Sequence, residues 1–416
     1  MSAYSRRLML RSMGAAAGLV AAGKLRSACA QTGAIRIGVV APLSGTQQLT
    51  GEPNLVGANV ARDYFNRQGG INGRAIEIVS RDDKGDPNST VSILRELVGA
   101  GINMFLGASI TPTALAAAGV IKDLDGVCLT QAVDDRLVRE AFTPHMFVGG
   151  TVGSTRDRGI ALLMAERYPE VSRWGAIVPD TAVGHDSWML FSTAVREFYR
   201  DRAKAEVTLL DPVLTKFGGT DFKSAIGTLS SMGIEGLFSL EYGADGVTFW
   251  KQAVQLGFAD KPKVICDQGL DITLGKTLGQ NTPPNDWALS FWWPEAYTSI
   301  PESEELRKQC IAITGDPFPR STYAFGFTSV AAYRTAILAA GSTETDKIVA
   351  ALENVKIKSV KGTVYFRKED HQIVDDVCII NVQPLATAPF WRVADYKTIP
   401  GSEVMLPPAP GKPHQL

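Results

Sequence analysis

Residues 35–87 read IRIGVVAPLSGTQQLTGEPNLVGANVARDYFNRQGGINGRAIEIVSRDDKGDP, and this stretch decides the fold class. Residues 35–40 and 75–81 are apolar runs of strand length. Between them, residues 55–68 repeat apolar side chains every three to four positions, which predicts a helix that Gly69-Gly70 ends. Strand, helix and strand in succession are typical of parallel pairing, because the helix provides the crossover.

The same alternation continues to residue 124 and starts again after Gly149-Gly150. A chain of 416 residues is too long for one domain with a single hydrophobic core of ordinary size. We therefore predict an α/β protein with two Rossmann-like lobes, each built on a parallel, doubly wound sheet. Further strands are expected at 102–106, 174–178, 205–210, 236–240 and 263–266. Further helices are expected at 89–99, 112–124, 155–168, 187–201, 222–232, 247–256, 322–340 and 345–354.

The C-terminal part of the chain has a different pattern. Residues 364–366 and 377–382 are short apolar runs, and we expect them to be late strands in a hairpin-like arrangement. Four prolines follow between residues 407 and 413, and they predict a disordered, Pro-rich tail over residues 401–416.

Composition excludes several classes of protein. The formal net charge is -1, so no basic excess indicates a nucleic-acid partner. Four scattered histidines, with no H-E-x-x-H and no G-x-S-x-G, leave no catalytic or metal-binding constellation. Residues 269–277 come close to a phosphate-binding loop but have one residue too many between the glycines. We therefore expect a binding protein that is not an enzyme and needs no cofactor.

The first thirty residues have the composition of an export signal. Arg6 and Arg7 open it, residues 8–22 are mostly apolar and small, and Ala28-Cys29-Ala30 resembles a cleavage site. The paired arginines resemble the twin-arginine pattern, so residues 1–30 predict export to the periplasm. Lipid attachment at Cys29 is the alternative.

Four cysteines lie beyond that signal, and no two of them form a C-x-x-C motif. Export permits disulfides, whereas isolated cysteines are also common as small buried apolar residues. The sequence leaves open which description holds for Cys128, Cys266, Cys310 and Cys378.

From residue 35 to about residue 391 the chain resembles the branched-chain amino-acid (Leu/Ile/Val-type) binding proteins of ABC importers. The resemblance rests on PLSG at 42–45, GGING at 69–73, GASITPTALAAAGV at 107–120 and GTDFKSAIGTL at 219–229. It implies a type 1 periplasmic binding protein fold, in which three hinge segments join the lobes and the ligand lies between them. An ABC permease is the implied partner, and a monomer is expected.

The resemblance also implies where the chain crosses between lobes, namely near Gly149, Trp292 and Gly362. Lobe 1 would then comprise residues 31–149 and about 293–361. Lobe 2 would comprise residues 150–292 and about 362–400. Closure of the two lobes about the hinge is the expected motion.

Ligand contacts are expected in the loop after the strand at 102–106. Backbone N–H groups ahead of a helix attract an anion, and the hydroxyls of Ser109 and Thr111, on either side of Ile110, add donors. The resemblance assigns the ligand carboxylate to this loop. The alternative is that Thr111 caps the next helix, and both roles are compatible.

Other positions follow from the resemblance alone. Gln131 and Val133 lie in the second ligand loop, where the family has a Thr at the position of Val133. Gln268 occupies the position of the family's acidic residue, and Tyr242 matches its aromatic wall. Two further aromatic positions are expected to be occupied by Thr50 and Val183. Trp292 and Trp293 either stack on a planar ligand or fill the hinge.

These departures bear on the class of ligand. A desolvated ammonium group needs a carboxylate or several acceptors, and Gln268 carries no charge. They favour a non-amino organic acid, such as an aromatic carboxylate. An amino-acid or amide ligand stays open, with Asp267 providing the charge through a one-residue shift. A ligand-sensing receptor subunit is the other function that this resemblance allows.

Overall fold

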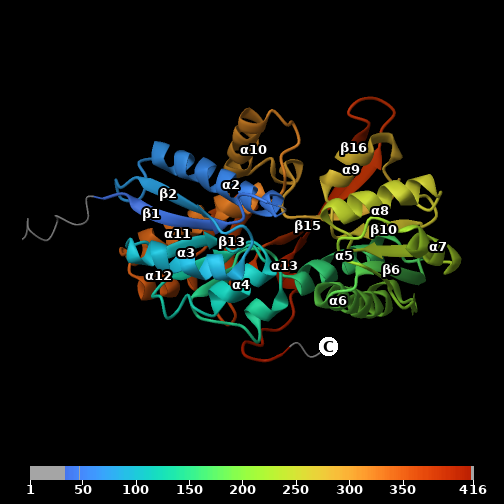
Figure 1. Cartoon of the computed structure of the whole chain (residues 1–416), viewed down its shortest axis with the longest axis horizontal. Helices are drawn as coiled ribbons and strands as arrows, with labels where there is room; N and C mark the ends of the chain where they lie inside the picture. Colours follow the sequence, from blue (N-terminus) through green and yellow to red (C-terminus); the bar gives the residue numbers. More distant parts are fainter. Residues whose placement is uncertain (1–32, 46, 414–416) are drawn as a thin grey trace, which may run out of the picture.

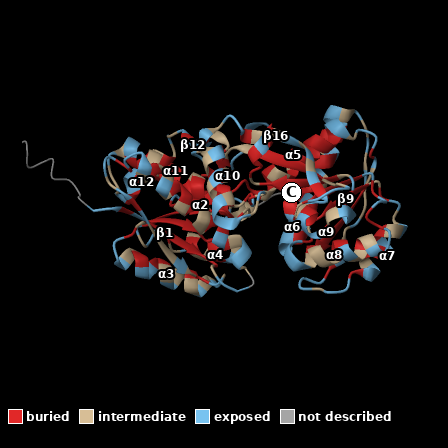
Figure 2. Ribbon diagram, turned by 90° about the horizontal axis from the view of Figure 1, so that it is seen from above, coloured by how far each residue is buried: buried red, intermediate tan, exposed pale blue. Residues whose placement is uncertain are grey.

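The computed structural model describes residues 33–45 and 47–413. Two α/β lobes lie side by side, and extended segments pass between them (Figure 1). The sheets are buried, while the covering helices are exposed on their outer sides (Figure 2). No helix among the described residues is both long and apolar enough to cross a membrane. The expected export signal lies outside the described residues.

Lobe 1 is built on a five-stranded parallel sheet with the order β2-β1-β3-β4-β5. One face packs against α2, α10, α11 and α12, and the other against α3 and α4, so each face buries an apolar core. The strands are β1 (Ile35–Ala41), β2 (Ile76–Asp82), β3 (Met104–Gly107), β4 (Val127–Thr130) and β5 (Met146–Val148). The helices are α2 (Gln48–Arg67), α3 (Pro87–Gly99), α4 (Thr111–Ala118), α10 (Pro301–Thr314), α11 (Tyr323–Ala340) and α12 (Thr345–Leu352).

Lobe 2 has a second, mixed sheet with the order β16-β15-β11-β10-β9-β6-β7, and β8 also pairs with β6. Its centre is parallel, whereas β15 and β16 add an antiparallel edge. Its strands are β6 (Arg173–Pro179), β7 (Thr208–Leu209), β8 (Val213–Thr215), β9 (Gly236–Ser239), β10 (Val264–Asp267), β11 (Asp286–Ser290), β15 (Asp376–Pro384) and β16 (Trp391–Pro400). Its helices are α5 (Gly153–Arg167), α6 (Ala182–Phe198), α7 (Lys223–Ser231), α8 (Gly243–Gln255), α9 (Ile272–Leu278) and α13 (Gly401–Val404).

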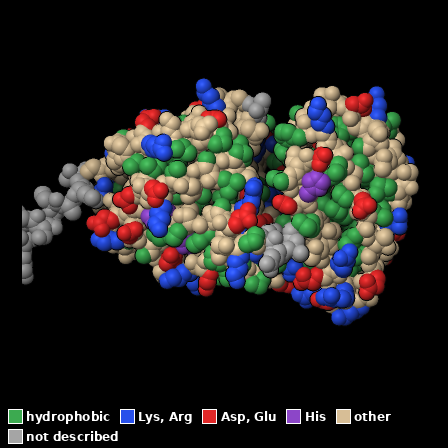
Figure 3. Space-filling model, turned by 60° about the horizontal axis from the view of Figure 1, so that its bottom comes forward, with side chains coloured by type: hydrophobic (Ala, Val, Ile, Leu, Met, Phe, Trp, Pro, Cys, Tyr) green, Lys and Arg blue, Asp and Glu red, His purple; other side chains and the backbone are tan. Residues whose placement is uncertain are grey.

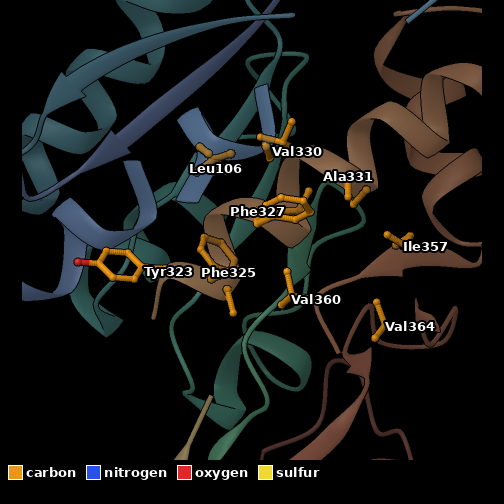
Figure 4. Close-up of a cluster of buried hydrophobic side chains, with 14 of the residues drawn as sticks. Leu106, Tyr323, Phe325, Phe327, Val330, Ala331, Ile357, Val360 and Val364 are labelled. Atoms are coloured by element: carbon orange, nitrogen blue, oxygen red, sulfur yellow. The ribbon is translucent and has the colours of Figure 1, made fainter. Parts of the chain in front are cut away.

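The close packing of α2 on α11 depends on two glycines. A Cβ atom at Gly57 would lie 2.0 Å from the carbonyl oxygen of Tyr323, and one at Gly326 would lie 2.0 Å from that of Asn54. Any other residue would force the helices apart. The close-up of this core shows aromatic side chains from α11 lying between the lobe 1 sheet and the segments around Val360 and Val364 (Figure 4).

The chain crosses between the lobes three times, after β5, after β11 and after β14. A small antiparallel sheet precedes the third crossing, and its strands are β12 (Ile357–Ser359), β13 (Gly362–Phe366) and β14 (Ile373–Val374). This small sheet shares the lobe 1 core through side chains such as Val364 and Phe366. The crossing expected near Gly362 therefore comes later, around residue 375.

Two further expectations about the C-terminal part were wrong. The runs at 364–366 and 377–382 do not form a hairpin, because β13 pairs with β12 and β14 whereas β15 pairs with β11 and β16. Residues 401–413 are also attached to the protein. Arg158 Nε donates to the carbonyl of Val404 at 2.8 Å, and the Gly411 N–H donates to the carbonyl of Arg139 at 2.7 Å.

The cysteines of the described residues are unpaired. Cys128, Cys266, Cys310 and Cys378 are all buried, and desolvation raises the pKa of the Cys128, Cys310 and Cys378 thiols to about 12. A thiol with so high a pKa is a poor nucleophile and a poor metal ligand. They serve as small apolar core residues, as one of the two alternatives predicted.

Candidate ligand-binding site

A cleft of about 570 Å³ opens between the lobes, a volume that suits a small organic molecule. In the space-filling view a notch separates the two halves of the molecule, and hydrophobic side chains lie on both of its rims (Figure 3). Lobe 1 contributes the start of α2 and the segment before α11, and lobe 2 contributes loops at the carboxyl ends of β8, β9, β10 and β11. Such strand ends are where open α/β sheets bind ligands.

An apolar wall occupies the mouth of the cleft. Leu49 stands on the lobe 1 side and is 59% exposed. Phe217 and Tyr242 line the cleft from lobe 2, and their ring centroids lie 5.6 Å apart. Exposed side chains of this size bury apolar surface when the lobes close over an apolar ligand, at about 25 cal/mol per Å².

Gln268 lies in the cleft with its orientation set from behind. Its Nε2 donates to Oδ1 of Asp157 at 2.6 Å, and its backbone N–H donates to the carbonyl of Ser239 at 2.9 Å. Since the amide NH₂ is held by Asp157, the carbonyl oxygen Oε1 remains to accept a hydrogen bond. Burial raises the pKa of Asp157 well above its ordinary value, and its Oδ2 has no partner among the described residues.

Asp271 is an acidic residue that lines the same cleft. Its Oδ2 accepts from Ser290 Oγ at 3.2 Å, while its buried Oδ1 has no partner among residues 33–45 and 47–413. The backbone is strained, with φ 51° and ψ -139°, a region that residues other than glycine rarely adopt. Burial raises the pKa of Asp271 to about 6, against hydrogen bonds from Ser321 and Ser290 that lower it.

Two arginines also line the cleft. The Arg156 guanidinium lies over the Phe291 ring, 4.7 Å from its centroid, and desolvation lowers its pKa. Arg320, in the segment before α11, is exposed on the lobe 1 side. The cleft therefore combines cations, the Asp271 carboxylate and an apolar wall, a set of groups suited to a small zwitterion or acid with an apolar part.

The family follows from a sequence comparison. The model of the family described as periplasmic binding protein matches residues 34–387. The chain belongs to the periplasmic binding protein family. Members are periplasmic, non-enzymatic substrate-binding proteins of ABC transporters. The Leu/Ile/Val-binding protein homolog 3 of Brucella melitensis is 26% identical over 80% of this chain and 87% of its own length.

Solved structures agree with this fold. A leucine-, isoleucine-, valine-, threonine- and alanine-binding protein from Brucella ovis, in a closed conformation, superposes with a TM-score of 0.79 at 18% identity. That comparison covers 91% of this chain and all of the other. A solute-binding protein from Rhodopseudomonas palustris in complex with 3,4-dihydroxybenzoic acid gives a TM-score of 0.72 at 18% identity, covering 85% of this chain and 94% of that one.

Three of the predicted site residues line the cleft of this periplasmic binding protein, namely Thr50, Tyr242 and Gln268. Thr50 uses its hydroxyl within the first turn of α2, where Oγ1 donates to the carbonyl of Gln47 at 2.7 Å. Asp267, proposed as a substitute acid, is occupied elsewhere. It accepts from the N–H groups of Gly269 and Leu270 at 2.8 and 2.7 Å and faces the Trp250 indole.

The remaining predicted residues do not line the cleft in this conformation; they are Ser109, Ile110, Thr111, Gln131, Val133 and Val183. Ser109 is nearly buried, and its Oγ accepts from Asn54 Nδ2 at 2.6 Å. Thr111 does not cap α4, because the N-cap is Ile110 and no side chain caps it.

The two hinge tryptophans belong to the core rather than to the ligand site. Trp292 is fully buried, and its Nε1 donates to Ser303 Oγ at 2.9 Å. Trp293 is 6% exposed within the same core. Neither ring faces the cleft, so the hinge-packing alternative holds for both.

Sequence reasoning missed Arg156, Phe217, Asp271 and Arg320, which all line the cleft. Arg156, Asp157 and Arg158 are three consecutive charged residues at a helix start, soon after Gly149-Gly150. Asp271 lies in the segment set aside as an imperfect phosphate loop. The signal that indicated Arg156 and Asp271 is a charged residue just after a predicted crossing or strand end.

Proposed function

We propose that this binding protein captures an amino acid with an apolar side chain and delivers it to an ABC importer. The observation that carries the proposal is Asp271, which lines the cleft and has a carboxylate oxygen, the buried Oδ1, without a hydrogen-bond partner among the described residues. A desolvated carboxylate whose hydrogen bonds are incomplete is costly, and the ammonium group of an amino acid relieves that cost. The apolar wall at the mouth suits the side chain.

Asp271 provides the carboxylate that is missing at the position of Gln268. The sequence favoured a non-amino acid because Gln268, at the position of the family's acidic residue, carries no charge. Asp271 follows three residues later and provides the charge, while Gln268 adds the acceptor Oε1. Two acceptors in one cleft suit an ammonium donor. The name of the Brucella melitensis relative, a Leu/Ile/Val-binding protein homolog, supports the same class of ligand.

A non-amino organic acid, such as an aromatic carboxylate, is the second candidate. Arg156 and Arg320 favour it, because two cations in one cleft attract an anion. The likeness to the Rhodopseudomonas palustris protein bound to 3,4-dihydroxybenzoic acid supports it as well. The two candidates differ in one group, the α-ammonium.

Calorimetric titration with leucine and with its des-amino analogue, 4-methylpentanoate, separates the candidates. We expect wild type to bind leucine more tightly, and Asp271→Asn to weaken leucine by about 10- to 100-fold, the usual loss of a charge-assisted bond. Asp245→Asn is the matched control, because Asp245 also lines the cleft but its carboxylate accepts from the Gly218 N–H at 2.6 Å. Tighter wild-type binding of 4-methylpentanoate than of every amino acid would reject the proposal.

The remaining parts of the function concern partners and export. We propose a monomer that docks on its permease with the lobes closed on the ligand, and export through the twin-arginine route. Replacing Arg6 and Arg7 by Lys should leave the precursor in the cytoplasm, because that route reads the arginine pair. Undiminished export of the double variant would indicate the general secretory route instead.

A further inference from the structure

Arg156 lies where the two lobes meet. It follows the first crossing and belongs to the first turn of α5, while Phe291, beneath its guanidinium, directly follows β11 at the second crossing. Both side chains line the cleft. The ring lies 4.7 Å from the guanidinium carbon and supports one face of the group. A guanidinium stacked in this way keeps its edge, with its N–H donors, available.

The charge of Arg156 has no protein partner within the part of the chain that the structure describes. Among residues 33–45 and 47–413 its guanidinium forms no salt bridge and no side-chain hydrogen bond, and its contacts are the Phe291 ring and the longer-range charges of Asp157 and Asp271. The neighbouring acids are engaged elsewhere, since Asp157 holds Gln268 and Asp271 accepts from Ser290. A cation in the first turn of a helix also opposes the helix dipole. This arginine therefore costs stability in the empty protein.

We propose that Arg156 binds the carboxylate of the ligand through its guanidinium edge, an inference that rests on the proposed function. Paired N–H groups of arginine match the two oxygens of a carboxylate, and Phe291 fixes the plane in which they meet it. Arg320 is not oriented in this way for a carboxylate, because it is exposed and no aromatic ring supports it among the described contacts. The carboxylate thus binds at the hinge, not on the loop of Ser109 and Thr111.

The position of Asp271 agrees with this assignment. Arg156 and Asp271 are close enough that each shifts the pKa of the other, although they form no ion pair. An α-amino acid carries its ammonium and carboxylate on the same carbon, so its two charged groups need oppositely charged partners that are near but separate. Arg156 and Asp271 meet that requirement within one cleft.

The test compares leucine with leucinamide, whose α-carboxylate is replaced by a neutral amide, on wild type, Arg156→Lys, Arg156→Met and Arg320→Met. We expect Arg156→Met to weaken leucine by about 10- to 100-fold and leucinamide by less than about 3-fold. Arg156→Lys should lose less leucine affinity than Arg156→Met, because lysine keeps the positive charge but lacks the paired N–H donors of the guanidinium. Arg320→Met should weaken leucine by less than about 3-fold.

Thermal unfolding without ligand distinguishes this role from a structural one. Loss of an unpaired, desolvated cation should leave the unfolding temperature of Arg156→Met unchanged or higher, whereas a structural arginine would lower it. Unchanged leucine affinity in Arg156→Met, or equal losses for leucine and leucinamide, would overturn the inference. The proposed function would still hold in that case, provided that wild type binds leucine. Absence of amino-acid binding by wild type would instead reject the proposed function.

Discussion

Gln268 and Asp157 join two separate parts of lobe 2 through a hydrogen bond of 2.6 Å from Nε2 to Oδ1. Gln268 lies after β10, and Asp157 lies in the first turns of α5. The bond turns the carbonyl oxygen of Gln268 away from Asp157 and leaves it as the acceptor in the cleft. In the proposed function, Asp157 is therefore a positioning residue for Gln268.

Replacing this amide by a carboxylate should destabilise the protein in a pH-dependent way. In Gln268→Glu two carboxyl groups would face each other in a buried site, so sharing a proton raises the pKa of the pair. A carboxyl whose folded pKa lies above its unfolded pKa loses stability as pH rises through that interval. We therefore expect a larger fall in unfolding temperature at pH 8 than at pH 5. Gln268→Met is the control, since it removes the hydrogen bond without adding a charge, and its loss should vary less with pH. Equal losses for Gln268→Glu at both pH values would contradict the contact.

Ligand affinity should depend on pH through Asp271. Burial raises the pKa of this carboxyl to about 6, and an ammonium ligand binds its ionised form. As pH falls through 6 the carboxyl takes up a proton, so affinity for leucine should drop, by at most about 10-fold per pH unit. Asp271→Asn should bind more weakly at pH 7 and lose most of that dependence between pH 5 and 7. A wild-type slope that persists in Asp271→Asn would assign it to another group, such as Asp267, whose pKa is also raised to about 6.

A buried ion pair holds the hinge together. Lys361 Nζ lies 2.6 Å from Asp375 Oδ2, the two side chains are 7% and 8% exposed, and Thr151 at the first crossing donates to Asp375 Oδ1 at 2.8 Å. Lys361→Met leaves a buried carboxylate without its cation, which should lower the free energy of unfolding by about 3–5 kcal/mol. Adding Asp375→Leu should restore much of that loss. Denaturant unfolding measures both, and a loss below ~1 kcal/mol in the single variant would show that the pair is solvated.

The C-terminal segment should limit how far the lobes open. Its start, α13, packs on α5 of lobe 2. Residues 405–413 then return to lobe 1, where Arg367 donates to the carbonyl of Leu406 at 2.9 Å and Gly411 donates to that of Arg139. Deleting residues 405–416 should increase the radius of gyration of the ligand-free protein in solution scattering. Deleting only residues 412–416 keeps both bonds and is the matched control. Identical radii for the two deletions would exclude a restraining role.

Local pattern was sufficient for most of the parallel core, because strand and helix periods are written in neighbouring residues. The strands at 35–40, 75–81 and 236–240 lie within one residue of β1, β2 and β9. The pairing of the strands was harder to predict. β13 and β15 are close in sequence, but they belong to different sheets because the chain changes lobe between them. Pro-rich composition predicted disorder at 401–413, where backbone carbonyls in fact accept hydrogen bonds from distant arginines.

The candidate site likewise has residues that the sequence predicted and residues that it did not. Thr50, Tyr242 and Gln268 were predicted as site residues and line the cleft, and each lies at a strand end or helix start that an alignment of short motifs can reach. Arg156 and Asp271 were missed because their roles depend on tertiary neighbours, the Phe291 ring in one case and a strained backbone with φ 51° in the other. Neither the ring contact nor the strained backbone can be predicted from nearby residues, and only a charge just after a crossing or strand end indicated these positions.

The decisive measurement is a crystal structure of the complex with the amino acid that binds most tightly in calorimetry. We expect the ligand between the lobes, with its carboxylate on the Arg156 guanidinium and its ammonium within hydrogen-bond distance of the Asp271 carboxylate and of Gln268 Oε1. The side chain should lie against Leu49, Phe217 and Tyr242. A ligand whose carboxylate is held by Ser109 and Thr111, with Arg156 and Asp271 out of contact, would contradict this expectation.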